Sequence, residues 1–98
     1  MNFKELTQSH PLVLVDFFAL WCGPCKMVPP ILEEVKKALG EQIKIIKIDV
    51  DKNPAVSDSF QIRSIPTMIL FQNGSPVWRQ SGVIPASELI SQIKKFAK

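Results

Sequence analysis

The chain has 98 residues, a net charge of +3 and a pI of about 9.0, with 46% of its residues hydrophobic and 21% charged. This length and average composition exclude a disordered chain and predict one domain over residues 1–98 with a single packed core. No apolar run approaches the ~18 residues of a membrane span, and the scattered lysines argue against nucleic-acid binding, which favours clustered charge.

The first half of the chain predicts a strand, a helix and a second strand after a short leading helix at residues 2–9. The apolar run at 12–18 shows no alternation, which is typical of a strand buried on both faces. Apolar residues at helical spacing then indicate a helix over 24–40, and the second strand follows at 43–49. A single helix between two strands implies that the two strands are parallel and joined by a right-handed crossover.

Local signals within that half mark where the elements should begin, bend and end. Gly40 suits a left-handed cap after the helix, while Pro29 and Pro30 interrupt the expected helix and predict a kink. Asn53 precedes a proline and is expected to cap the next helix with its side chain.

The second half predicts a short helix over 53–60, a strand at 67–72, a tight turn at Asn73-Gly74 and an antiparallel edge strand at 76–81. A last helix begins near Pro85. The order is β-α-β-α-β-β-α, so the fold class is α/β with a central mixed four-stranded sheet flanked by helices. Met27 and Met68 are expected in the core.

Cys22 and Cys25 stand where the first buried strand gives way to a helix. Helix N-termini present free N–H groups and a partial positive charge, which stabilise a thiolate. We therefore expect a lowered pKa for Cys22, the nucleophile. Cys25, about one helical turn further on and less exposed, is placed to resolve a mixed disulfide by thiol–disulfide exchange.

Two other uses of the cysteine pair fit the sequence less well. A structural zinc site needs about four ligands, and this chain offers two cysteines and the lone His10. A structural staple would close so short a loop that it would remove little entropy from the unfolded chain. The pair is therefore interpreted as redox-active. No metal is expected because of this ligand count. No nucleotide cofactor is expected, because no phosphate-binding loop is present.

Asp16 lies inside the apolar run at 14–18, where burial would raise the pKa of its carboxyl group. A raised pKa suits a general acid or base, although a strand-end aspartate facing solvent is the alternative. From the sequence alone, Lys47 in the second strand is as compatible with a solvated surface position as with a functional role.

The chain resembles the thioredoxin family in its cysteine segment and in a second signature further along. The dipeptide Gly23-Pro24 between the cysteines favours thioredoxins over relatives with histidine or tyrosine there. The resemblance runs over residues 10–97 and implies a thioredoxin fold that lacks or shortens the extra N-terminal strand of many members. The segments that carry it are 15–26, 62–67, 71–74 and Gly82.

The resemblance also implies roles for residues whose own chemistry is not decisive. It places Asp16 beneath the cysteine pair, handling the proton of Cys25, and pairs Asp16 with Lys47, which would lower the pKa that burial raises. It implies a cis Ile65–Pro66 bond facing the cysteines, where local chemistry alone predicts trans. The substrate-facing residues that it implies are Trp21, Gly23, Pro24, Ile65, Pro66 and Gly82.

Two departures from the family pattern bear on partner choice. Leu20 brings an apolar side chain to a position that is commonly polar or small, and Ser64 replaces a common glycine beside the expected cis-proline loop. Neither removes a residue of the expected chemistry.

The function predicted from these residues is that of a protein-disulfide reductase, expected to be a monomer. The family resemblance implies that its electrons come from an NADPH-dependent flavoprotein, thioredoxin reductase. The N-terminus shows no apolar leader, which predicts a cytoplasmic protein. Two alternatives stay open: a thiol oxidase or isomerase of an exported compartment whose leader was trimmed, and a non-enzymatic binding module that uses the groove around Trp21, Ile65 and Gly82.

Overall fold

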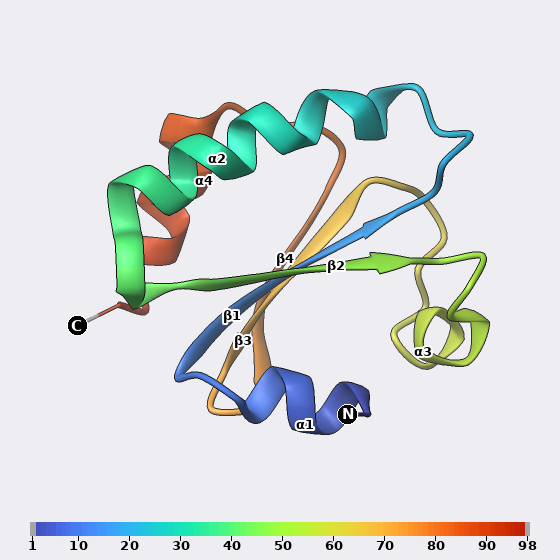
Figure 1. The fold of residues 1–98 in the computed structure, drawn as a ribbon, viewed down its shortest axis with the longest axis horizontal. Coiled ribbons are helices and arrows are strands. Elements are labelled where there is room, and N and C mark those ends of the chain that lie inside the picture. The colour runs from blue at the N-terminus through green and yellow to red at the C-terminus, as the bar shows by residue number, and fades with distance from the viewer. Residues whose placement is uncertain (1, 98) are drawn as a thin grey trace.

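The computed structural model describes residues 2–97 and shows a four-stranded mixed sheet in the order β2-β1-β3-β4 (Figure 1). β1 is parallel to β2 and antiparallel to β3, and β3 is antiparallel to β4. The predicted sheet and element order are therefore confirmed. The strands are β1 (Leu12–Phe18), β2 (Lys44–Asp49), β3 (Thr67–Gln72) and β4 (Ser75–Ser81).

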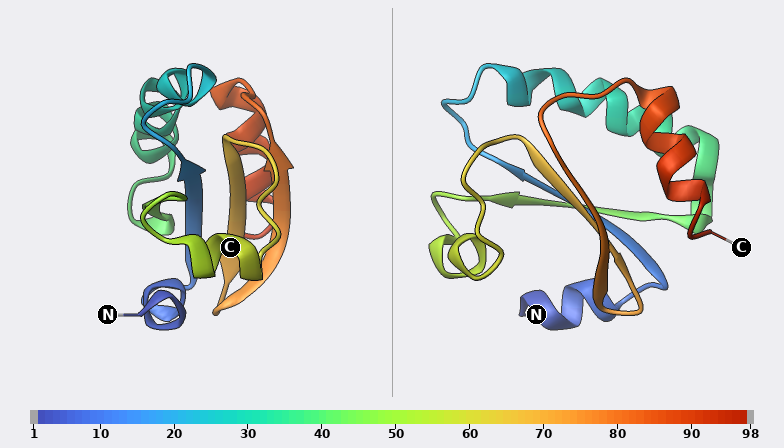
Figure 2. Two further views of the ribbon diagram at one scale, coloured as in Figure 1. Left: turned by 90° about the vertical axis from the view of Figure 1, so that its right-hand side faces the viewer. Right: turned by 180° about the vertical axis from the view of Figure 1, so that it is seen from behind.

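Helices cover both faces of this sheet. α2 and α4 lie on one face, and α1 and α3 lie on the other (Figures 1 and 2). None of the described helices is long and apolar enough to cross a membrane. The α-helices are α1 (Phe3–Gln8), α2 (Val28–Leu39), α3 (Pro54–Ser59) and α4 (Ala86–Lys94), and two 3-10 helices, η1 (Pro24–Met27) and η2 (Gly40–Gln42), flank α2.

β1 is buried on both faces, which explains why its sequence does not alternate. Successive side chains of a strand point to opposite faces. Leu12 and Leu14 therefore join the core under α2 and α4, while Val13, Val15 and Phe17 join the core under α1 and α3. This central strand supports the site at its carboxyl end.

The predicted helix over 24–40 is divided in the structure, so the expected mid-helix kink is wrong in its form. A 3-10 helix covers Pro24–Met27, and the α-helix begins only at Val28. Pro29 and Pro30 fall in the first turn of α2, where a missing N–H costs nothing. Neither ring nitrogen can donate back to the carbonyl groups four residues earlier, so α-helical bonding cannot extend towards the cysteines.

Three local expectations are also corrected. Gly40 ends α2 with a positive φ of 54°, but its ψ of −125° lies outside the left-handed helical region. Asn53 occupies the N-cap position of α3 without capping it, because its side chain donates a 3.0 Å hydrogen bond to the Asp49 carbonyl oxygen. Met68 is buried as expected, whereas Met27 is 61% exposed, because η1 turns that side chain away from the sheet.

A substitution at Gly40 tests whether the positive φ at the end of α2 requires glycine. Gly40→Ala is expected to lower the free energy of unfolding by about 1–2 kcal/mol, because a side chain disfavours positive φ even though the added methyl group meets no atom within 4 Å. Gly23, with a φ of −59° and similarly open surroundings, is the matched control. Gly23→Ala should leave stability unchanged or raise it by about 0.4–1 kcal/mol. Urea unfolding of the oxidised proteins measures both, and equal effects at the two positions would contradict the argument.

Candidate active site

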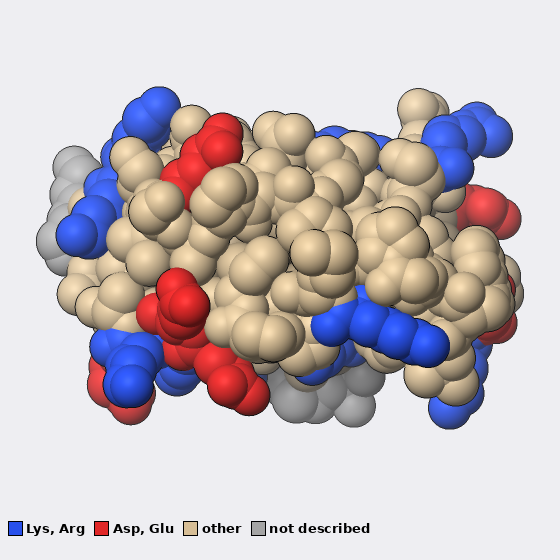
Figure 3. Space-filling model, turned by 90° about the horizontal axis from the view of Figure 1, so that it is seen from above, with Lys and Arg blue, Asp and Glu red and all other residues tan. Residues whose placement is uncertain are grey.

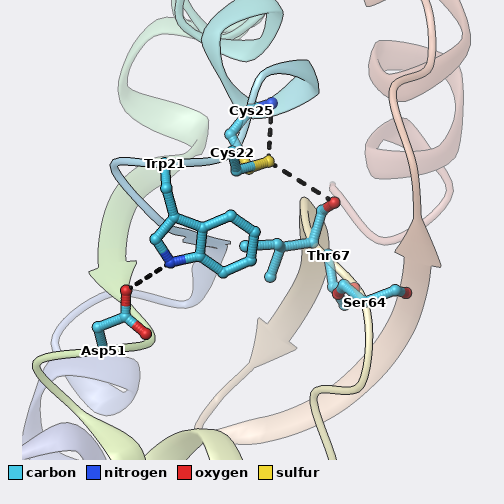
Figure 4. The surroundings of a disulfide bond; sticks show 7 residues. Trp21, Cys22, Cys25, Asp51, Ser64 and Thr67 are labelled. Carbon is cyan, nitrogen blue, oxygen red and sulfur yellow. Dashed lines mark hydrogen bonds between the residues drawn. A yellow bond between two sulfur atoms is a disulfide. The ribbon is translucent and has the colours of Figure 1, made fainter.

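Cys22 and Cys25 form a disulfide bond at the start of η1, with their Cα atoms 5.3 Å apart (Figure 4). Gly23 is the N-cap of η1 and Pro24 its first residue, so the pair stands at a helix N-terminus as predicted. The backbone N–H of Cys25 donates to the Cys22 sulfur at an N–S distance of 3.2 Å. Such an N–H favours a thiolate at Cys22 once the disulfide is reduced.

The expected difference in exposure between the two cysteines is absent. Cys22 is 4% exposed and Cys25 is 6% exposed, so Cys25 is not the better covered of the two. In the disulfide form both pack in one small cluster with Ala19, against Phe18, Val50 and Ile65. Residue exposure therefore does not distinguish the two cysteines in this state, whereas the hydrogen bond from the Cys25 N–H to the Cys22 sulfur does.

The loop before β3 brings distant residues to the pair. The Ile65–Pro66 bond is cis, as the resemblance implied, and the Ile65 carbonyl oxygen lies 3.8 Å from the Cys22 sulfur. The Gly82 N–H donates to the Pro66 carbonyl oxygen at 2.8 Å, with a φ of 87° that suits glycine. Ile65 thus faces Cys22 across the end of the sheet, and Gly82 is bonded to the neighbouring Pro66.

Trp21 projects from the surface beside the pair, with 71% of its area exposed. Its indole N–H donates to the Asp51 side chain at 2.8 Å (Figure 4). Asp51 follows β2 and was not anticipated from the sequence, because nothing in its local pattern signals a contact with a residue 30 positions away. This bond fixes the ring over a 150 Å³ depression that is lined by Val50 and residues 62–65.

The pair has an apolar rim. Leu20 is 70% exposed and Met27 is 61% exposed, and with Trp21 they make up three of the four large hydrophobic side chains that are exposed in the described part of the chain. Exposed apolar side chains gathered at one place are typical of a surface that binds another protein. Charged side chains of both signs are interspersed over the face seen in Figure 3 rather than gathered by sign.

Asp16 is buried, as predicted, with 2% of its surface exposed. It lies two residues after Leu14 along β1, so it shares the face of Leu14, which is covered by α2 and α4. Its Oδ1 atom has no hydrogen-bond partner among the described residues. Burial raises the pKa of this carboxyl group from its ordinary value of 3.8 to about 6, against the opposing effect of the Lys47 charge.

Lys47 does not form the direct ion pair that the resemblance implied. It lies directly opposite Asp16 in the β1–β2 register, but its side chain is exposed at the sheet edge, and no hydrogen bond joins the two side chains within residues 2–97. Lys47 therefore acts on Asp16 through space, which is why the desolvation effect dominates the pKa.

His10 is engaged elsewhere in the molecule. Its Nδ1 atom accepts a 3.1 Å hydrogen bond from the Leu12 N–H, and its Nε2 atom donates to the Glu41 carbonyl oxygen at 2.7 Å. Across residues 2–97, no group of three or more potential metal ligands comes together.

A cysteine pair at a helix start, faced by a cis-proline loop across a mixed sheet of this order, defines a thiol–disulfide oxidoreductase of the thioredoxin fold. The thioredoxin family model matches residues 1–95. The chain belongs to the thioredoxin family and carries out dithiol–disulfide exchange.

The similarity to known relatives extends over nearly the whole chain. It is 51% identical to a thioredoxin-like protein of Synechocystis sp., covering 97% of this chain and 91% of that protein. It is 48% identical to the bifunctional thioredoxin reductase/thioredoxin of Mycobacterium leprae, covering 93% of this chain and 20% of that protein. The solution structure of oxidised thioredoxin from Plasmodium falciparum superposes with a TM-score of 0.84 at 40% identity, covering 98% of this chain and 90% of that one.

The buried carboxyl group predicts a specific pH dependence of stability. Because the pKa of Asp16 is higher in the folded protein than in the unfolded chain, ionising it destabilises the fold. This penalty is absent below pH 3.8, grows as the pH rises to about 6, and reaches about 3 kcal/mol above that. Asp16→Asn, which cannot ionise, should therefore be more stable than wild type at pH 8 and no more stable near pH 4.

Urea unfolding of the oxidised proteins at the two pH values measures this difference. Glu34→Gln, which removes an exposed carboxylate from α2, is the control and should show no comparable gain at pH 8. A gain for Asp16→Asn that is equal at pH 4 and pH 8 would show that charge burial is not its cause.

Proposed function

We propose that this thioredoxin is a protein-disulfide reductase, with Cys22 as the nucleophile and Cys25 as the resolving cysteine. The observation that carries the assignment is the backbone N–H of Cys25, which points at the Cys22 sulfur. A donor in this position stabilises negative charge on Cys22 and not on Cys25. Cys22 is therefore the sulfur that carries the thiolate in the reduced protein.

The reaction runs in two exchange steps. The Cys22 thiolate attacks one sulfur of the substrate disulfide, forming a mixed disulfide and releasing the first substrate thiolate, which takes up a proton from water. The Cys25 thiolate then attacks the Cys22 sulfur, closing the Cys22–Cys25 disulfide and releasing the second substrate thiolate. Two electrons pass from the cysteine pair to the substrate, so the pair itself is the redox centre.

Asp16 accepts the proton of Cys25 in the second step. Its buried carboxyl group, with a pKa raised to about 6, is ionised at neutral pH yet more basic than an ordinary aspartate. The unpartnered Oδ1 atom is free to accept a hydrogen bond, directly or through water. Lys47 keeps Asp16 ionised by opposing the effect of burial on its pKa.

Substrates bind as extended segments against the cis-proline loop. The Ile65 backbone offers strand-like hydrogen bonds beside Cys22, a mode in which main-chain contacts supply affinity without demanding a sequence. Trp21 covers the substrate from the other side. The rest of this surface is formed by residues with small or compact side chains, namely Gly23, Pro24, Pro66 and Gly82. Leu20 and Met27 extend the apolar rim and favour substrates with apolar residues next to the disulfide.

The oxidised pair is regenerated by a thioredoxin reductase, an NADPH-dependent flavoprotein. The Mycobacterium leprae relative, in which a thioredoxin reductase and a thioredoxin share one chain, supports this partnership. The protein works as a monomeric electron carrier in a reducing compartment, the cytoplasm, where dithiols are kept reduced.

Single cysteine variants test the two roles. Cys22→Ser is expected to abolish reduction of a protein disulfide such as insulin, because no thiolate remains at the attacking position. Cys25→Ser should instead form a mixed disulfide with the substrate that persists on non-reducing gels, because nothing resolves it. A persistent adduct with Cys22→Ser, and none with Cys25→Ser, would reverse the assignment.

The direction of electron flow is tested by the reduction potential of the Cys22–Cys25 couple, measured by equilibration with glutathione buffers. We expect a value near the −270 mV of thioredoxin, a reference figure for the family rather than one calculated from this site. That would make the reduced pair a donor to most protein disulfides. A value near −120 mV, which is typical of a strong oxidant, would point to an oxidase.

A further inference from the structure

The chain leaves α3 through a turn that normally requires glycine. The Ile62 N–H donates to the Ser57 carbonyl oxygen at 2.9 Å, and the Gln61 N–H donates to the Asp58 carbonyl oxygen at 3.0 Å. These two bonds define a Schellman motif, in which the residue just past the helix adopts a left-handed conformation. Here that residue is Gln61, with a φ of 52°. A residue with a Cβ atom disfavours this conformation, so the turn needs support from elsewhere.

Arg79 of β4 provides that support. Its Nη1 atom donates to the Phe60 carbonyl oxygen, and its Nη2 atom donates to the Gln61 carbonyl oxygen at 2.9 Å. The planar guanidinium group presents two donors at a fixed spacing, so it binds two successive carbonyl groups at once. Its positive charge also lies at the carboxyl end of a helix, where a cation is favoured.

The segment that Arg79 holds is the one that faces the cysteines. We call residues 60–66 the docking loop. At its far end the Thr67 hydroxyl donates to the Ser64 carbonyl oxygen at 2.7 Å and is hydrogen-bonded to the Ser81 hydroxyl at 2.9 Å. Figure 4 shows Ser64 and Thr67 close to the disulfide. The end of β4 and the residue after it thus hold both ends of the docking loop: Arg79 at the start, and Ser81 and Gly82 at the end.

We propose that Arg79 is a positioning residue for the exchange reaction, which keeps the docking loop in the conformation that presents the Ile65 backbone to a protein substrate opposite Cys22. The inference rests on the proposed function in one respect, that protein substrates bind along Ile65. Within residues 2–97, no hydrogen bond joins Arg79 to Trp21 or to either cysteine. Its loss therefore weakens substrate binding without altering the chemistry of the pair.

The first test compares KM for insulin with the rate of reduction of a small aromatic disulfide, which needs little of the docking loop. Arg79→Met should raise KM for insulin roughly tenfold, the order expected for a lost charge-assisted contact at an exposed site, and should leave kcat, the small-disulfide rate and the reduction potential unchanged. Arg79→Lys should raise KM for insulin by less than Arg79→Met does but still above the wild-type value, because a point charge cannot serve two carbonyl groups equally. Lys37→Met, on exposed α2 surface, controls for the lost charge.

A second test asks whether Arg79 acts through Gln61. Gln61→Gly in the Arg79→Met background removes the penalty for positive φ and should restore KM for insulin towards the wild-type value. Gln61→Ala in the same background keeps that penalty and should not. In the Arg79→Met protein, hydrogen exchange at the Ile62 amide, whose bond to Ser57 closes the turn, should speed up relative to Lys37→Met.

Two results would overturn the inference. If Arg79→Met changes the urea midpoint but neither KM for insulin nor Ile62 exchange, Arg79 serves stability alone. If KM rises while Ile62 exchange stays constant and Gln61→Gly gives no recovery, Arg79 touches the substrate directly. Failure of the proposed function is distinguishable, because the wild-type protein would then not reduce insulin, whereas failure of this inference leaves wild-type activity intact.

Discussion

The pairing of β1 with a neighbour on each side is the constraint on which the rest of the structure depends. β2 runs parallel to β1, β3 runs antiparallel, and β4 returns in the direction of β1. The carboxyl ends of β1, β2 and β4 and the amino end of β3 therefore meet at one end of the sheet. Trp21, Cys22, Ile65 and Gly82 lie on connections at that end, and Asp16 lies within β1. The topology, rather than any local sequence signal, is what brings together segments that are more than 40 residues apart.

Burial of β1 on both faces has an energetic cost at Asp16. The strand that holds the cysteine segment rigidly also carries Asp16 into the core, where one carboxylate oxygen lacks a partner. Desolvation then raises the pKa to about 6, and Lys47, at the exposed sheet edge, only partly opposes it. The protein thus keeps a destabilising charge at the position where we propose a proton acceptor, and strongly shifted pKa values are common at functional sites.

The surface around the cysteine pair is held by contacts from outside the cysteine segment. Asp51, at the end of β2, fixes the Trp21 ring, and Arg79 and Ser81 of β4 hold the two ends of the docking loop. In the described part of the chain, no hydrogen bond joins these residues to either sulfur. The cysteine pair at the start of η1 is therefore separate from the surface that we propose for substrate recognition, which contacts from β2 and β4 support.

The sequence by itself determined the order of elements, the doubly buried central strand and the redox character of the Cys22–Cys25 pair, because hydrophobic periodicity and residue chemistry act over a few neighbouring positions. The cis proline and the residues across the site were accessible only through the family resemblance, since local chemistry favours a trans bond. Tertiary structure alone decided that Met27 faces solvent and that both cysteine residues are buried in the disulfide. It also decided that Lys47 acts on Asp16 without a direct ion pair, and that Asp51 and Arg79 support the site. Each of these depends on which side chains approach one another across the sheet edge, and that information is not contained in the spacing of residues along the chain.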